Sequence, residues 1–304
     1  MTHSMMTRVL CCITCIAATA HSASAQGNPP GTVTVSAAVT GIRTFDAGLG
    51  QGGKMRWSNS AISGSVTRQM VPAFAAGVSL RYASEEWLFD SPEAFGGMPP
   101  WRDMRRASVG LNLSLALSRT LLVGVSPAVE WANDARADAA DALTYGAVVS
   151  AVKVFRPDLT LGTGASIHRK FYSVKVSPFV VVNWKLNEYL RIANTLSAGP
   201  QGGAGVELRW AFAPDWELAG GGVTKSDRYR LAPAGPYADD IGETSSIPLF
   251  ARLSRKLGPL FKADLYLGSM AQGRLKIKDS GGREIASDGY GTTPAIAATV
   301  SFKH

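Results

Sequence analysis

The stretch RASVGLNLSLALS, from Arg106 to Ser118, decides the fold class. Every second position from 109 to 117 is apolar, and these positions hold Val109, Leu111, Leu113, Leu115 and Leu117. The positions around them hold small or polar residues: Ser108, Gly110, Asn112, Ser114 and Ala116. A period of two places each set on its own face of a β-strand, so the segment predicts a strand with one apolar and one polar face.

The same alternation recurs along the chain, in AGVSLRYAS (76–84), AGVELRWAF (204–212) and PAIAATVSF (294–302). A soluble β-sandwich alternates in the same way, so the connections between the strands have to decide the architecture. Strand-like segments are joined alternately by very short turns and by longer loops, which is the pattern of a barrel in a membrane. Because lipid offers no hydrogen-bond partner to a free sheet edge, such a sheet must close on itself.

The connections also predict the number of strands. The predicted short turns, most of which contain Pro, Asp or Asn, are 70–72, 118–120, 156–158, 187–188, 213–215 and 258–259. The predicted longer loops are 43–53, 90–105, 133–141, 198–203, 226–245 and 270–291, with HRKFYS near Ser173 as a tight connection. The sequence therefore predicts an all-β fold, a closed antiparallel transmembrane β-barrel of about fourteen strands. Twelve strands is the alternative, because strand boundaries are uncertain by several residues.

The N-terminal segment has the three parts of a secretory signal in order. Arg8 is its positive residue, residues 9–20 are apolar, and Ala23-Ser24-Ala25 has the small-x-small form of a cleavage site. We therefore predict a cleavable signal peptide over 1–25 and a single barrel domain over 26–304, with a buried N-terminal helix as the alternative. All three cysteines lie before residue 25, so the exported domain cannot form disulfides.

Aromatic residues gather beside the predicted short turns. They are Phe155, Trp184, Tyr189, Trp210, Phe212, Trp216 and Phe261. Barrels carry an aromatic girdle at the membrane–water interface, and this shared position favours a girdle over seven separate core residues.

Several segments resemble a family of uncharacterised bacterial outer-membrane β-barrel proteins, grouped as a domain of unknown function. The segments are SVKVSPFVVVNWKLNEYLRI, GAGVELRWAFAPDWELAGG, DRYRL, IPLFARLSRKLGP and GRLKIKDSGGREI, within residues 145–304. The resemblance implies a barrel in the cell outer membrane of a Gram-negative bacterium and implies no catalytic residues. It also implies the barrel assembly machinery as a partner, which in such barrels recognises a final aromatic residue. Here Phe302 is followed by Lys303 and His304.

With the apolar face of each strand turned to lipid, the other face carries more bases than acids. The predicted basic lining of the lumen is Arg81, Arg106, Lys170, Lys175, Lys185, Arg209, Lys225, Arg252 and Lys262. The predicted opposing acids are Glu130, Glu207, Glu217 and Asp264. A basic lining favours anions, so we expect a weakly anion-selective pore or a site for an anionic solute. The alternative is a closed lumen filled by ion pairs, with some of these residues at the rims.

Two further groups of residues are weaker candidates. Ser166 and His168 share the lumen-facing phase of one strand and could serve a lipid hydrolase or deacylase, although the sequence places no acid to orient the histidine. The alternative is a histidine that only forms hydrogen bonds in the lumen. Acids in the long loops, such as Asp138 and Asp240, are either solvated or bridged by divalent cations to lipopolysaccharide. No cofactor is expected, and no metal site is expected because the exported domain has no cysteine and, besides the terminal His304, only His168. No nucleic-acid partner is expected because the net charge of +8 is scattered along the chain.

The leading prediction is a passive outer-membrane channel or transporter for small anionic or amphiphilic solutes, in contact with outer-membrane lipid and lipopolysaccharide. It is not expected to be an enzyme. The alternatives are an outer-membrane lipid-modifying enzyme and a closed barrel that acts in structure or through its surface loops.

Overall fold

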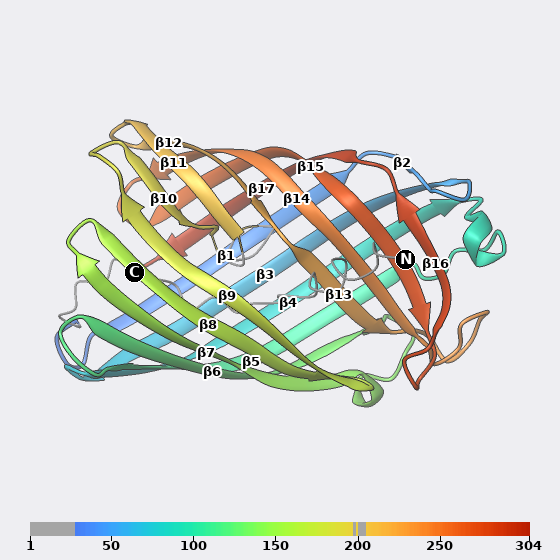
Figure 1. Cartoon of the computed structure of the whole chain (residues 1–304), viewed down its shortest axis with the longest axis horizontal. Coiled ribbons are helices and arrows are strands. Elements are labelled where there is room, and N and C mark those ends of the chain that lie inside the picture. Colours follow the sequence, from blue (N-terminus) through green and yellow to red (C-terminus); the bar gives the residue numbers. More distant parts are fainter. Residues whose placement is uncertain (1–27, 197–198, 200–204) are drawn as a thin grey trace, which may run out of the picture.

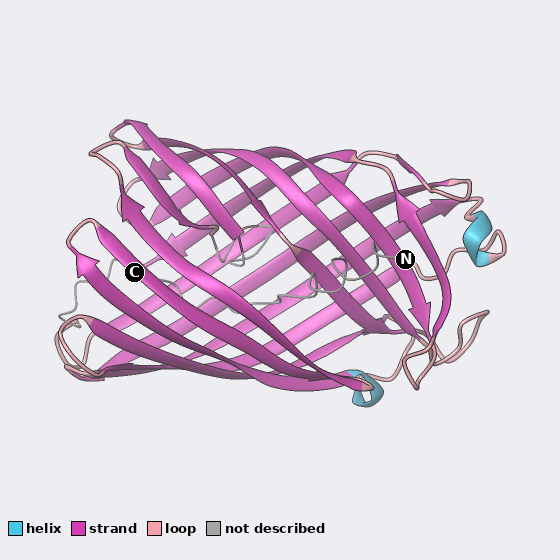
Figure 2. Ribbon diagram, in the orientation of Figure 1, coloured by secondary structure: helices cyan, strands magenta, loops and turns pink. Residues whose placement is uncertain are grey.

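A computed structural model describes residues 28–196, 199 and 205–304 of the protein. These residues form one closed antiparallel β-barrel of fourteen strands, as the sequence predicts (Figures 1 and 2). The predicted signal peptide and the three cysteines lie outside the described residues. In the described part of the chain the helices are two short 3₁₀ turns, η1 (Glu93–Phe95) and η2 (Ala140–Ala142), and no helix is long and apolar enough to span a membrane.

Eleven of the fourteen wall positions are single strands. They are β3 (Lys54–Val71), β4 (Phe74–Asp90), β5 (Asp103–Ala116), β6 (Leu121–Asp134), β7 (Leu143–Arg156), β8 (Leu159–Lys170), β9 (Ser173–Lys185), β10 (Leu190–Asn194), β11 (Gly205–Ala213), β14 (Ile241–Leu257) and β15 (Phe261–Lys278). The other three positions are interrupted strands: β1 (Val33–Thr44) with β2 (Ala47–Gly48), β12 (Trp216–Val223) with β13 (Lys225–Arg230), and β16 (Glu284–Tyr290) with β17 (Thr293–Lys303). Both parts of each pair hydrogen-bond to the same neighbouring strand.

The ring closes where the first and last strands meet. β1 pairs with β17 from Ser36 opposite Lys303 to Thr44 opposite Ala295, and β1 pairs on its other edge with β3. The six predicted short turns all connect neighbouring strands at one end of the barrel, and the longer loops that the structure describes, such as 91–102 and 135–142, lie at the other end (Figure 1). Of the predicted loop 198–203, all but residue 199 lies outside the described residues. We call these the turn end and the loop end.

Two predicted loops are largely strand. Within 270–291, β15 runs to Lys278 and β16 starts at Glu284, and within 226–245 lie most of β13 and the start of β14. The side chains of Leu275 and Ile277 explain the first difference, because both are fully buried and anchor the extended hairpin. Its polar residues also pair, as Lys276 does with Glu284 at 2.5 Å.

The outer surface carries the apolar half of the period-two pattern. Leu111, Leu115 and Leu117 are exposed on the outside of the closed ring, with similar residues on the other strands. Such a surface is stable in lipid and unfavourable in water, which makes the barrel transmembrane. Of the aromatics beside the short turns, six are exposed: Phe155, Trp184, Tyr189, Trp210, Phe212 and Phe261.

Apolar side chains fill the interior near the loop end. Trp57, Trp87 and Trp101 are each at most 3% exposed, and the ring of Trp87 lies 5.8 Å from that of Trp57 and 5.7 Å from that of Trp101. Phe95 of η1 is buried in the same cluster, so the loop 91–102 lies over this end of the lumen. These side chains narrow the lumen near the loop end of the barrel.

Beside β9, the wall has few backbone hydrogen bonds and is completed by contacts between side chains. β9 pairs with β10 through Asn183–Lys185 only, whereas it pairs with β8 along its whole length. Toward the loop end, Glu243 of β14 contacts three cations, Arg228 at 2.9 Å, Lys278 at 3.1 Å and Lys175 at 3.6 Å. We call these four residues the seam cluster.

Replacing Glu243 by glutamine is expected to lower the free energy of unfolding by about 2 kcal/mol, because three cations would then face one another without their anion. Urea unfolding of the detergent-folded barrel, followed by its gel mobility, would measure the change. Glu188→Gln, in the exposed turn 186–189, is the matched control. Equal stability of the two variants would contradict the role given to the seam cluster.

Candidate functional site in the lumen

The strand β13 crosses the interior of the barrel. It pairs with β14 from Lys225 to Arg230, and Arg230 also forms a single parallel bridge with Asn133 of β6, on a distant part of the wall. Its sequence, KSDRYR, has no apolar face to present to lipid. We call β13 the crossbar.

Successive residues of the crossbar contact different strands. Arg106 of β5 donates a hydrogen bond to Asp227 at 2.6 Å, and the Tyr229 hydroxyl donates to Glu85 of β4 at 2.7 Å. In the opposite direction, the guanidinium of Arg228 donates to the Ser173 hydroxyl of β9 at 2.9 Å. Both faces of the crossbar are therefore buried, and the strand is held across the lumen by polar contacts.

A central ion-pair cluster surrounds the Arg106–Asp227 contact. Glu130 of β6 lies 2.9 Å from the ammonium of Lys170 and 3.9 Å from the guanidinium of Arg106. Lys225 lies 3.5 Å from the second oxygen of Asp227. The four side chains other than Lys225 are at most 13% exposed, so these charges depend on one another rather than on bulk water.

A second cluster lies nearer the turn end. The fully buried guanidinium of Arg252 contacts Glu207 at 2.7 Å, Glu217 at 2.8 Å and Asp264 at 3.1 Å. Arg209 and Lys262 contact the same carboxylates from more open positions, at 2.6 Å to Glu207 and 3.2 Å to Asp264. Ser254 links the Arg252 guanidinium to Asp264 by hydrogen bonds. We call this the Arg252 cluster.

The structure places most of the predicted lining residues inside the barrel. One of the predicted residues differs, because Lys185 is exposed beside the turn that follows β9. Lys175 lies opposite His168 on the inward face of β9 and belongs to the seam cluster. Together with Arg81, the cations of the central cluster and the Arg252 cluster are Arg106, Lys170, Arg209, Lys225, Arg252 and Lys262, and Arg228 of the crossbar pairs separately with Glu243.

The predicted ratio of nine cations to four anions is wrong. Together with Glu85, the acids of the same two clusters are Glu130, Glu207, Glu217, Asp227 and Asp264. Glu243, which the sequence placed in a surface loop, is in the seam cluster. Seven cations thus face six carboxylates, and the excess of positive charge is small.

Sequence reasoning missed Glu85, Asp227 and Tyr229. The signal that could have found the last two is the absence of an apolar face in residues 225–230, because a strand without such a face cannot lie against lipid. Glu85 gave no such signal, since its strand alternates like its neighbours.

Ser166 and His168 are in direct contact on β8. The Ser166 hydroxyl lies 2.7 Å from Nδ1 of the imidazole. Lys170, two residues further along the strand, is engaged with Glu130. In the part of the chain that the structure describes, no carboxylate hydrogen-bonds to the imidazole, so the pair lacks the acid that orients a catalytic histidine.

No family model matches the chain, and no curated protein matches it. Among solved structures, it is similar to an outer membrane channel from Pseudomonas putida F1, with 9% identity over 93% of this chain and 98% of that one and a TM-score of 0.47. It is also similar to the toluene transporter TodX of Pseudomonas putida, with 10% identity over 91% of this chain and 90% of that one and a TM-score of 0.44.

Proposed function

We propose that this protein is a passive channel for small anionic or amphiphilic solutes across the outer membrane of a Gram-negative bacterium, exported by a signal peptide over 1–25. The observation that carries the proposal is the charged interior of a closed barrel whose outer face is apolar. The more open of these charges favour a hydrated path beside the buried ion pairs, and they are Arg209, Glu217, Lys225 and Lys262, at 17–29% exposure. The resemblance of residues 145–304 to uncharacterised outer-membrane barrels agrees with this location.

The balance of charges supports only a weak preference for anions. Most interior cations are paired with carboxylates, and a paired cation attracts a passing anion less than a free one does. The crossbar and the aromatic packing near the loop end narrow the path, which favours small solutes over polymers.

Single-channel recording in a planar bilayer tests the proposal. Residues 26–304, refolded in detergent, should give discrete conductance steps, and a salt gradient should give a reversal potential that slightly favours the anion. Steps with a clear preference for cations would contradict the charge assignment. A folded barrel that gives no steps would contradict the channel itself and favour a structural or surface-interaction barrel.

The contact between Ser166 and His168 keeps one second candidate, an outer-membrane lipid hydrolase. The channel proposal expects His168→Ala to retain the wild-type conductance. The imidazole takes part neither in the hydrogen bonds that hold the crossbar nor in the Arg252 cluster. Release of fatty acid from phospholipid vesicles by the wild type, lost in His168→Ala and in Ser166→Ala, would overturn the assignment as a non-enzyme.

A further inference from the structure

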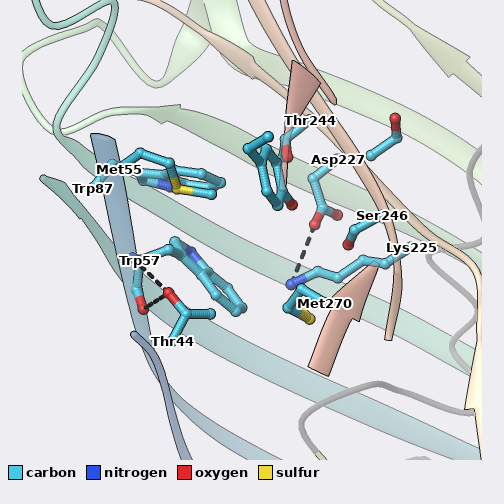
Figure 3. A pocket seen from close by; sticks show the side chains of 11 residues that line it. Thr44, Met55, Trp57, Trp87, Lys225, Asp227, Thr244, Ser246 and Met270 are labelled. Atoms are coloured by element: carbon cyan, nitrogen blue, oxygen red, sulfur yellow. Dashed lines mark hydrogen bonds and ion pairs between the residues drawn. The ribbon is translucent and has the colours of Figure 1, made fainter. Parts of the chain in front are cut away.

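A pocket lies between the crossbar and the opposite wall (Figure 3). Its apolar lining consists of Met55, Trp57, Trp87, Met270 and Tyr290. Its polar lining consists of Thr44, Lys225, Asp227, Thr244, Ser245 and Ser246. The enclosed free space is about 10 Å³, room for about one water molecule, so a larger ligand enters only when a lining side chain moves aside.

The hydrogen bonds in and beside the pocket leave more donors than acceptors. Nε1 of Trp87 is buried without an acceptor, and so are Nε and Nη2 of Arg106, the residue that binds Asp227. One acceptor there lacks a hydrogen bond, Oδ2 of Asp227, and it faces the ammonium of Lys225 at 3.5 Å. Buried donors without acceptors are costly, and a ligand with acceptor oxygens would relieve that cost.

Lys225 occupies the aromatic side of the pocket in the ligand-free form. Its ammonium lies 4.2 Å from the centre of the Trp57 ring, and Figure 3 shows the side chain extended between Trp57 and Asp227. The Lys225 side chain is 21% exposed and Met270 is buried, and both side chains are unbranched and flexible. These two side chains can move aside, whereas Trp57 is fixed by a hydrogen bond from Nε1 to Glu85 at 2.9 Å.

The local charge is also positive. Arg81, Arg106, Lys170 and Lys225 surround the crossbar, and the acids among them are Glu85, Glu130 and Asp227. A neutral aromatic solute would use the ring surface but leave this excess charge and the free donors as they are. A solute with a ring and a carboxylate would cover the aromatic surface, accept hydrogen bonds from the free donors and balance the excess positive charge.

We propose that this pocket binds a small aromatic carboxylate, which deepens the proposed channel function and rests on it. The ring lies against Trp57 in the place now taken by the Lys225 ammonium. The carboxylate accepts hydrogen bonds from the displaced ammonium and from Nε1 of Trp87. Because Lys225 belongs to the crossbar, the bound solute contacts the element that narrows the lumen.

Calorimetric titration of the detergent-folded barrel with sodium benzoate tests the site. Benzoate should bind, whereas benzamide, which keeps the ring and loses the charge, and acetate, which keeps the charge and loses the ring, should each bind about tenfold more weakly or not at all. Lys225→Met should weaken benzoate binding about tenfold. Trp87→Phe, which keeps the ring surface and removes the donor, should weaken it less. Lys153→Met, on the outward face of β7, is the matched control and should bind like the wild type.

The outcome for the pocket is separable from that for the channel. Equal binding of benzoate and benzamide, or unchanged benzoate binding in Lys225→Met, would overturn the site even if the barrel conducts. Selective benzoate binding by a barrel without conductance would keep the site and reject the channel. Each variant is first checked for folding by its heat-modifiable gel mobility. If Lys225→Met does not fold, Trp87→Phe decides the test, and an unchanged benzoate affinity of Trp87→Phe would overturn the site.

Discussion

Replacing Arg252 by methionine should destabilise the barrel by about 3–5 kcal/mol, the largest stability effect expected for a single substitution in this chain. Arg252 is fully buried and contacts Glu207, Glu217 and Asp264, all within 3.1 Å. Methionine fills much of the same volume but leaves three carboxylates close together without their shared cation. The midpoint of urea unfolding in detergent would measure the loss.

The neighbouring residue Arg255 supplies the control. It lies on the same strand, is exposed, and rests over the ring of Trp216 at 5.0 Å. Arg255→Met should change the unfolding free energy by less than about 1 kcal/mol, the usual value of an exposed cation–π contact. If both variants unfold at the same urea concentration, the Arg252 cluster does not stabilise the barrel as we describe.

Releasing the crossbar should increase the single-channel conductance about twofold or more, because the strand occupies part of the lumen where it pairs with the loop-end part of β14, from Ile241 to Ser246. The double variant Arg106→Gln, Tyr229→Phe removes the ionic contact to Asp227 and the hydrogen bond to Glu85. The crossbar then keeps its pairing with β14, its bridge to Asn133 and the hydrogen bond from Arg228 to Ser173, but it loses its side-chain contacts with β4 and β5. Conductance steps in a planar bilayer would show the change.

A matched double variant lies on the outer face of β5, which carries Arg106, and of β4, which carries Glu85, the partner of Tyr229. Arg105 and Tyr82 neighbour the substituted region and are exposed, so Arg105→Gln, Tyr82→Phe changes similar chemistry outside the lumen. This control should conduct like the wild type. Wild-type steps in the crossbar variant as well would show that β13 does not limit the flow.

The sequence predicts the wall of this barrel better than its interior. Outward residues of β5, such as Leu111 and Leu115, can be predicted from their apolar side chains and their phase along the strand alone. Each contacts lipid independently of residues elsewhere in the chain. The partner of Arg106, by contrast, is Asp227, 121 residues further along the chain. That pairing depends on β13 turning inward, which no local pattern in the flanking strands encodes.

The interior charges show the same limit. The phase of the alternation placed Glu130 and Glu207 inside, where they lie, but it could not assign Glu243 at the start of β14. There the strand is buried on both faces, so the period-two rule no longer separates lipid from lumen. The excess of cations was overestimated because Glu85 and Asp227 were not assigned to the interior, and the expected ion selectivity is correspondingly weak.

The pairing of β1 with β17 has a consequence for how the barrel assembles. Ser36 faces Lys303, so the contacts that complete the ring join residues from opposite ends of the chain. Contacts of such long sequence separation carry a large loop-closure entropy and form slowly. Until they form, β1 and β17 each expose an edge with unpaired backbone groups, and two chains at this stage can pair with each other. The hydrogen bonds between β1 and β17 therefore remove the two free edges through which an incompletely folded chain can aggregate.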